Sequence, residues 1–220
     1  DKANKKWSAE LEIGSETRAI SQKGPYVFEP DLEEIQKGIE ISSAQDALLF
    51  ASTVVTGYTK NPPQELEAKM SIKRRFYDLK GQRLEKRKFN IGDMILVRLD
   101  VSAQKMLPDA LVVDLLPAGV ELENQNLGHS LQIKDIEIEG EAIWKMMQQV
   151  QIKHQEYRDD RYVCALVMRP EQEYSLFYLV QVVSPGKFSV PPPMAESMYR
   201  PEIRAIGRAE EDIRIVNSIN

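Results

Sequence analysis

Few residues in this chain of 220 have the types and spacing that enzymes use for chemistry. The two histidines, His129 and His154, have no cysteine or carboxylate at metal-ligand spacing, so we expect no metal site. The single cysteine, Cys164, lies in the apolar run Tyr162–Met168, where a thiol behaves as a small buried hydrophobe. Neither a phosphate-binding glycine loop nor a serine or zinc hydrolase motif occurs. The sequence therefore predicts no enzyme and no cofactor.

Two acids stand between two arginines in the segment Arg158–Arg161, directly before an apolar run. Neighbouring carboxylates can take part in acid–base catalysis, but adjacent residues on an extended chain point to opposite faces. We favour a turn in which an aspartate bonds its own backbone and the arginines fork onto carboxylates.

The segment Lys69–Lys88 is strongly basic, with nine lysines and arginines against two acids. A partner with an acidic surface could be steered there, and Lys73, Arg74 and Arg75 are the candidate contacts. The alternative is an exposed hairpin whose charge keeps it soluble and prevents edge-to-edge pairing. The sequence leaves both interpretations open.

Composition narrows the class of protein. Hydrophobic residues make up 42% and charged residues 29%, which is typical of a globular chain. A net charge of -5 argues against nucleic-acid binding, because phosphate neutralisation needs a basic surface. The apolar runs are too short for a membrane-spanning helix, and one cysteine allows no internal disulfide.

Alternation of apolar and polar residues with a period of two dominates the chain and predicts strands. Helical patterns are few: one covers Gly140–Val150, and a turn of helix is expected at Ala195–Tyr199 after three prolines. The expected strands are Ala47–Val55, Leu66–Tyr77, Met94–Val101, Ala110–Leu115, Tyr162–Met168, Tyr174–Val183 and Arg204–Ile206. The sequence predicts an all-β fold, an antiparallel β-sandwich with one or two short helices.

A domain boundary is expected at Asn61–Pro63, because neither proline can donate to a strand ladder. Residues 1–63 hold too few strand patterns for a sandwich and predict a partial β-domain, whereas residues 64–220 hold the complete one. The chain starts without an initiator methionine or a signal peptide, so we expect it to be a piece of a longer protein.

Three strings are more specific than these patterns: Asp114–Gly119 (DLLPAG), Tyr157–Tyr162 (YRDDRY) and Ser184–Pro192 (SPGKFSVPP), continued by Met198–Glu202 (MYRPE). Together and in this order they resemble the C-terminal macroglobulin-like domain of bacterial alpha-2-macroglobulins. The resemblance covers about residues 64–216. A weaker likeness, carried mainly by Ala47–Tyr58, relates residues 1–63 to the end of the β-domain that follows the thioester domain in this family.

The resemblance implies a broad-spectrum protease inhibitor in the periplasm, anchored to the inner membrane through the N-terminus of the full-length parent. In such proteins an attacking protease cuts a bait region, and thioester-bearing members then bind it through a Cys-x-Glu-Gln motif. Cys164 is followed by Ala165-Leu166-Val167, so that motif is absent here. The implied partners are proteases, acting on the parent, and the thioester domain of the same chain; we expect the fragment to be a monomer.

The resemblance also implies a role for Met198 and Tyr199, because the family's shielding residues lie on the matching Met-Tyr-Arg-Pro stretch. In thioester-bearing members, the last domain covers the thioester and excludes water. Both residues could instead pack on the edge of the sandwich. The alternative function is a β-sandwich interaction module of a thioester-less relative, which binds an envelope protein through the Lys69–Lys88 segment.

Overall fold

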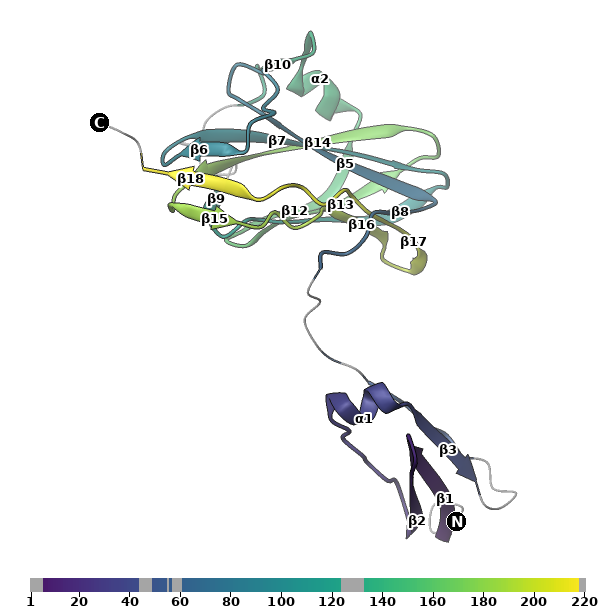
Figure 1. The fold of residues 1–220 in the computed structure, drawn as a ribbon. Coiled ribbons are helices and arrows are strands. Elements are labelled where there is room, and N and C mark those ends of the chain that lie inside the picture. The colour runs from purple at the N-terminus through teal and green to yellow at the C-terminus, as the bar shows by residue number, and fades with distance from the viewer. Residues whose placement is uncertain (1–5, 44–48, 55, 57–60, 124–132, 218–220) are drawn as a thin grey trace. The chain divides into compact units, whose positions relative to one another are not determined.

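The computed structural model describes residues 6–43, 49–54, 56, 61–123 and 133–217 and divides the chain into two compact units, Asp1–Gly57 and Tyr58–Asn220 (Figure 1). Antiparallel sheets dominate each unit, as the sequence predicts. Within the described residues, neither helix has the length and apolar character needed to cross a membrane. The assignment of residues 1–63 to the β-domain stays a prediction.

The first unit is a small antiparallel sheet in the order β2-β1-β3 with one short helix. Its elements are β1 (Lys6–Ile13), β2 (Glu16–Lys23), α1 (Leu32–Lys37) and β3 (Ile39–Ser43). Ala9, Leu11 and Ile13 alternate along β1 and are its buried apolar side chains among the described residues. The strand predicted at 47–55 is wrong over residues 49–54, which form no strand; residues 47, 48 and 55 lie outside the described residues.

The second unit is a sandwich of a six-stranded sheet, ordered β12-β13-β8-β16-β17-β4, and a four-stranded sheet, ordered β5-β7-β14-β9. The six-stranded sheet consists of β4 (Leu66–Ala68), β8 (Leu107–Leu115), β12 (Gln151–Arg158), β13 (Arg161–Met168), β16 (Met194–Ser197) and β17 (Arg200–Ile206). The four-stranded sheet consists of β5 (Met70–Tyr77), β7 (Met94–Ala103), β9 (Val120–Glu123) and β14 (Glu173–Val182).

Smaller elements complete this unit. A three-stranded sheet, β15-β18-β6, includes one parallel pair, β18 with β6, and β10 and β11 form a short hairpin beside helix α2. Their bounds are β6 (Lys88–Asn90), β10 (Glu137–Ile138), β11 (Glu141–Ala142), α2 (Ile143–Gln148), β15 (Gly186–Phe188) and β18 (Ile213–Val216). Helix α2 lies within the predicted helical stretch 140–150.

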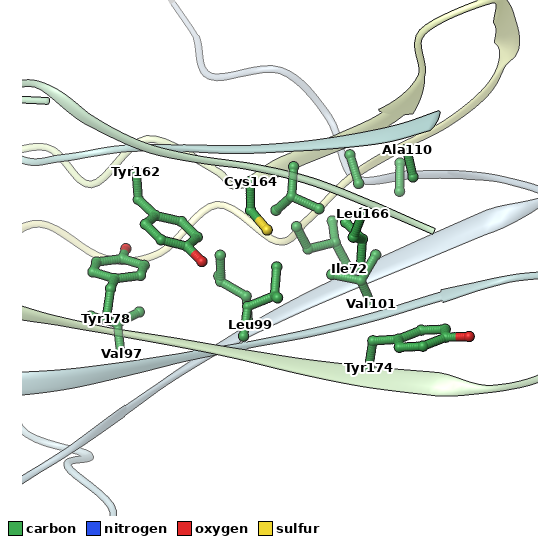
Figure 2. Packing of buried hydrophobic residues seen from close by; sticks show 14 of the residues in the cluster. Ile72, Val97, Leu99, Val101, Ala110, Tyr162, Cys164, Leu166, Tyr174 and Tyr178 are labelled. Carbon is green, nitrogen blue, oxygen red and sulfur yellow. The ribbon is translucent and has the colours of Figure 1, made fainter. Parts of the chain in front are cut away.

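The main core fills the space between the two large sheets. On β7, the odd-numbered side chains such as Leu99 and Val101 point inward, and on β13 the even-numbered Cys164 and Leu166 do (Figure 2). Each is essentially inaccessible to solvent, and burying a side chain of this size contributes about 1.5–3 kcal/mol. A second cluster, which includes Leu96 of β7, covers the opposite face of the four-stranded sheet with side chains from α2.

Two local predictions need correction. The expected turn of helix at Ala195–Tyr199 is wrong, because these residues lie in β16 and the turn that follows it. Pairing of β16 with β8 and β17 overrides the helical preference that follows the prolines. The single strand expected over Leu66–Tyr77 is broken at Lys69, whose φ of 61° sends β4 to one sheet and β5 to the other.

Candidate functional site

Among the described residues of the second unit, the most exposed large apolar side chains lie at the tip of the β16–β17 hairpin. A two-residue turn of Met198 and Tyr199 joins the strands, and these side chains are 53% and 78% exposed. Exposed apolar side chains that lie next to one another, rather than singly, are typical of surfaces that meet another protein. Sequence analysis singled out both residues, and the structure places them side by side in the chain at one loop.

Hydrogen bonds hold the tip of this hairpin against neighbouring segments. The Met198 amide donates to the Asp109 carbonyl on β8 at 3.0 Å. Arg200 Nη2 donates to the carbonyl of Met106 at 2.7 Å, which brings the β7–β8 connection beside the hairpin. Met106 is itself 48% exposed. Sequence reasoning missed Met106, since only the fold brings it near Arg200, which lies 94 positions later.

The basic candidates on β5 are separated by the alternation of the strand. Lys73 is exposed, and Arg75 on the same face is 28% exposed in its side chain and paired with Asp100. Arg74 points the other way, into the sandwich, where its side chain is 2% exposed and paired with Asp114. A partner on the surface cannot reach the Arg74 guanidinium, so only Lys73 and Arg75 suit the proposed contact.

Arg74 belongs to a buried polar cluster. Its Nη1 donates to Asp114 Oδ1 at 2.5 Å, and Tyr178 donates its hydroxyl to Asp114 Oδ2 at 2.6 Å. Asp114 is fully buried, and this burial raises the pKa of its carboxyl, a rise that Arg74 and Tyr178 oppose. The ring of Tyr162 stacks on Tyr178 with centroids 4.6 Å apart (Figure 2).

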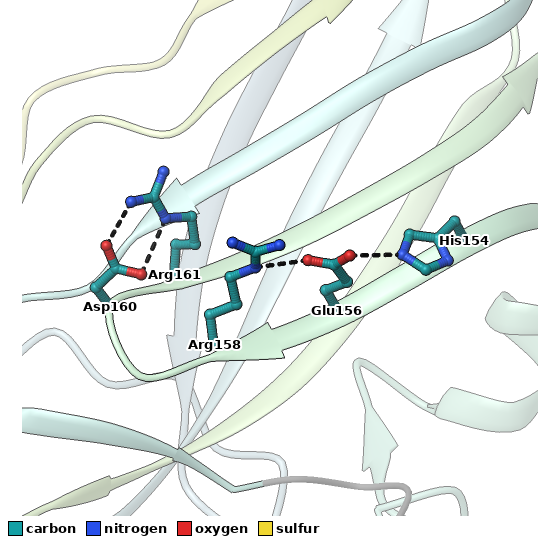
Figure 3. A network of polar contacts seen from close by, with 5 residues as sticks. All are labelled: His154, Glu156, Arg158, Asp160 and Arg161. Atoms are coloured by element: carbon teal, nitrogen blue, oxygen red, sulfur yellow. Dashed lines mark hydrogen bonds and ion pairs between the residues drawn. The ribbon is translucent and has the colours of Figure 1, made fainter.

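The Arg158–Arg161 segment forms the turn that the sequence predicts. It joins β12 to β13, and Arg161 forks onto Asp160 with bonds of 2.9 and 2.5 Å (Figure 3). His154, 63% exposed, bonds Glu156, which also accepts from Arg158. His154, Glu156 and Arg158 lie in a row on the solvent face of β12. This row has the geometry of surface ion pairs.

The single cysteine is buried and unreactive. Burial raises the pKa of the Cys164 thiol to about 12, so it remains protonated and inert at neutral pH. The described residues contain no cluster of histidine, cysteine and acidic groups able to hold a metal ion. His129 lies outside the described residues.

Comparison with known proteins agrees with this architecture. Residues 70–202 match a family model described as the bacterial alpha-2-macroglobulin MG10 domain. Alpha-2-macroglobulin of Xylella fastidiosa (strain Temecula1) is 35% identical over 204 residues, 93% of this chain and 12% of that protein. The Escherichia coli K12 protein is 41% identical over 174 residues, 79% of this chain and 10% of that protein.

Solved structures show the same similarity. Native E. coli alpha-2-macroglobulin, from domain MG7 to the C-terminus, superposes with a TM-score of 0.76 at 34% identity over 96% of this chain and 33% of that one. A tyrosine-to-glycine mutant of the Salmonella protein gives 0.78 at 30% identity over 98% of this chain and 13% of that one. The chain spans about a tenth of the curated relatives' length. It belongs to the bacterial alpha-2-macroglobulin family, and residues 70–202 form its MG10 domain.

Proposed function

We propose that this chain is part of a periplasmic, membrane-anchored protease inhibitor and that its β16–β17 hairpin shields a thioester carried elsewhere in the full-length parent. Related solved structures include the E. coli protein activated by porcine elastase and the same protein activated by trypsin. Another is the Salmonella protein reacted with methylamine, a small amine nucleophile. These structures support a function in which a protease triggers the parent and an acyl group reacts.

The exposed hairpin tip carries this proposal. A thioester survives in water only if nucleophiles are kept from its carbonyl, and a cover of apolar side chains excludes them. Met198 is a flexible plug, and Tyr199 combines an apolar ring with a polar end. Because the Met198 amide is bonded to β8, the backbone of the tip is held in place. This chain supplies the cover and not the bond, since Cys164 is buried and lacks the Cys-x-Glu-Gln context.

The experiment is methylamine reactivity of the full-length parent, followed by titration of the released thiol. Met198→Ala, Tyr199→Ala and the double variant are compared with Leu79→Ala, which truncates an exposed apolar side chain on another loop. Faster thiol release in the hairpin variants, with the control unchanged, is expected. If no thiol appears even in the denatured parent, or if the double variant reacts at the wild-type rate, shielding by this hairpin is wrong.

A second candidate function rests on the groove beside β5. This groove, of about 530 Å³, is lined by Lys73, Arg75 and Arg208 together with several acids, and it suits an envelope protein with an acidic segment. The test is a Lys73→Glu/Arg75→Glu parent, which leaves the buried Arg74 intact. Loss of partner capture with unchanged methylamine reactivity supports this function, and unchanged capture removes the groove from consideration.

A further inference from the structure

The buried cluster around Arg74 also contacts the segment that leads into the hairpin. Arg74 Nη1 faces Asp114, whereas Nη2 donates to the carbonyl of Pro191 at 2.8 Å. One guanidinium therefore joins strands β5 and β8 to the chain that precedes β16. This forked contact uses the geometry that distinguishes arginine from lysine, two donors held at a fixed angle.

The three strings that carry the family resemblance meet at this cluster. Asp114 begins the first string, Tyr162 ends the second, and Pro191 lies in the third. Tyr178 links the first two, because its hydroxyl bonds Asp114 and its ring stacks on Tyr162. One residue from each of the three strings therefore lies in the same buried cluster, although the strings are far apart in the chain.

The segment Pro191–Pro193 needs such a contact. It belongs to no strand, and its prolines have no amide hydrogen to donate, so hydrogen bonds can reach it only through its carbonyls. Arg74 donates to the Pro191 carbonyl, and the Gly207 amide donates to that of Pro193 at 2.8 Å. Pro193 leads directly into β16, whose far end carries Met198.

We propose that Arg74 is a positioning residue for the hairpin tip: by bridging the Asp114 carboxylate and the Pro191 carbonyl, it fixes the path of β16 and so the placement of Met198 and Tyr199. This role goes beyond the ion pair with Asp114, because it depends on the hydrogen bond that Arg74 Nη2 donates to the Pro191 carbonyl. Its effect on a thioester rests on the proposed function, whereas its effect on the hairpin does not.

The test is amide hydrogen exchange on the 220-residue chain with Arg74→Lys, which keeps the charge facing Asp114 and loses the fork. The reporter is the Met198 amide, because its bond to Asp109 opens when β16 shifts. Exchange at Met198 should accelerate about tenfold more than the exchange of core amides of β7, as expected for local opening. Equal acceleration at both places, or none at Met198, overturns the proposal.

Asp100→Asn is the matched control. Asp100 is also a buried aspartate held by arginines and a hydroxyl, with Arg98 Nε and Ser175 Oγ each at 2.7 Å, but it faces away from the proline segment. Asp100→Asn should accelerate exchange of the Met198 amide no more than it accelerates exchange of the core amides of β7. If it accelerates Met198 as selectively as Arg74→Lys does, positioning by Arg74 is refuted.

Tyr178→Phe is a milder second variant, useful if Arg74→Lys does not fold. It removes the hydrogen bond to one oxygen of the Asp114 carboxylate, which orients the Arg74 guanidinium. A smaller selective rise in the exchange rate of the Met198 amide is therefore expected. Absence of a selective rise counts against the proposal. The Arg74→Lys parent then separates the two claims with methylamine. A loosened hairpin with unchanged thiol release supports positioning and refutes shielding, while an unchanged hairpin refutes positioning whatever the methylamine rate.

Discussion

Replacing Tyr178 by phenylalanine tests the energetic value of the buried cluster. The substitution removes one hydroxyl and keeps the ring, so the stack on Tyr162 remains and no large cavity forms. It deprives Asp114 of the donor at 2.6 Å and leaves the carboxylate with Arg74 alone. The change therefore isolates one hydrogen bond to a charged, fully buried acceptor.

The expected loss is about 1.5–3 kcal/mol in the free energy of unfolding, the range for hydrogen bonds to charged groups. For a domain of this size that corresponds to a fall in Tm of about 3–12 °C. Removing the hydroxyl also raises the native pKa of Asp114 further, since that bond favours the ionised form. The loss should therefore be largest above that pKa and shrink as the pH falls through it.

The assay is urea unfolding followed by tryptophan fluorescence. The chain has two tryptophans, Trp7 in the first unit and Trp144 in the second, so a Trp7→Phe background restricts the signal to the sandwich. Tyr174→Phe is the control, because its buried hydroxyl bonds only neutral groups, and it should lose about 0.5–1.5 kcal/mol. If Tyr178→Phe loses no more than Tyr174→Phe, the charged cluster does not stabilise the fold as argued.

Two further predictions use the same assay. Burial raises the native pKa of Cys164 to about 12, whereas the pKa of an unfolded cysteine is about 8.5. The thiol of the unfolded state therefore loses its proton first as the pH rises. The free energy of unfolding falls by about 1.4 kcal/mol per pH unit from about pH 9 upward. Between roughly pH 8 and 10 only the thiol of the unfolded state titrates, so Cys164→Ala should remove this fall in stability over that range. An unchanged slope of stability against pH would contradict the prediction. A Cβ at Gly81, where φ is 75°, would lie 1.8 Å from the Glu137 carbonyl oxygen, whereas one at Gly92 meets nothing within 4 Å. Gly92→Ala should lower the free energy of unfolding by about 1–2 kcal/mol, because alanine is strained at this positive φ. Gly81→Ala should lower it by at least ~2 kcal/mol more, because the added Cβ also clashes with the Glu137 carbonyl. Equal losses would show that the clash relaxes freely.

The strands of the sandwich could be predicted because each is a short run rich in β-branched and aromatic residues. Burial alternates with a period of two along β13, whereas β7 and β14 are buried on both faces. The predicted strands Met94–Val101, Tyr162–Met168 and Tyr174–Val183 correspond to β7, β13 and β14 with boundary differences of a few residues at most. Burial of Cys164 follows from the same alternation and is confirmed. These features are local, so a single sequence contains enough information for them.

Arg74 shows what the charge count alone concealed. Lys73, Arg74 and Arg75 were grouped as one basic surface, but Ile72, Arg74 and Phe76 share the inward face of β5. Alternation along the predicted strand Leu66–Tyr77 already indicates that placement, because residues 72, 74 and 76 share one face of a strand. The buried partner, Asp114, lies 40 positions away, and no local pattern indicates it.

Helix α1 was missed although it has a local signal. Asp31 accepts from the Glu34 amide at 2.8 Å, and Glu34 accepts from the Asp31 amide at 3.1 Å, which is a capping box. At the opposite extreme, the helix expected at Ala195–Tyr199 depended on local preference alone. Its replacement by β16 is a tertiary effect, since the neighbouring strand β8 is more than 80 positions earlier.

The pairing of the outer strands has a consequence for how the domain is made. β4 pairs with β17, and β6 pairs in parallel with β18, so strands synthesised early find their partners near the end of the chain. At ribosomal speed, β6 has to wait roughly 6 to 25 s for β18 to be translated. Such distant contacts also slow folding. The sandwich therefore cannot complete its folding before β18 has been synthesised, and its early strands need protection from aggregation until then.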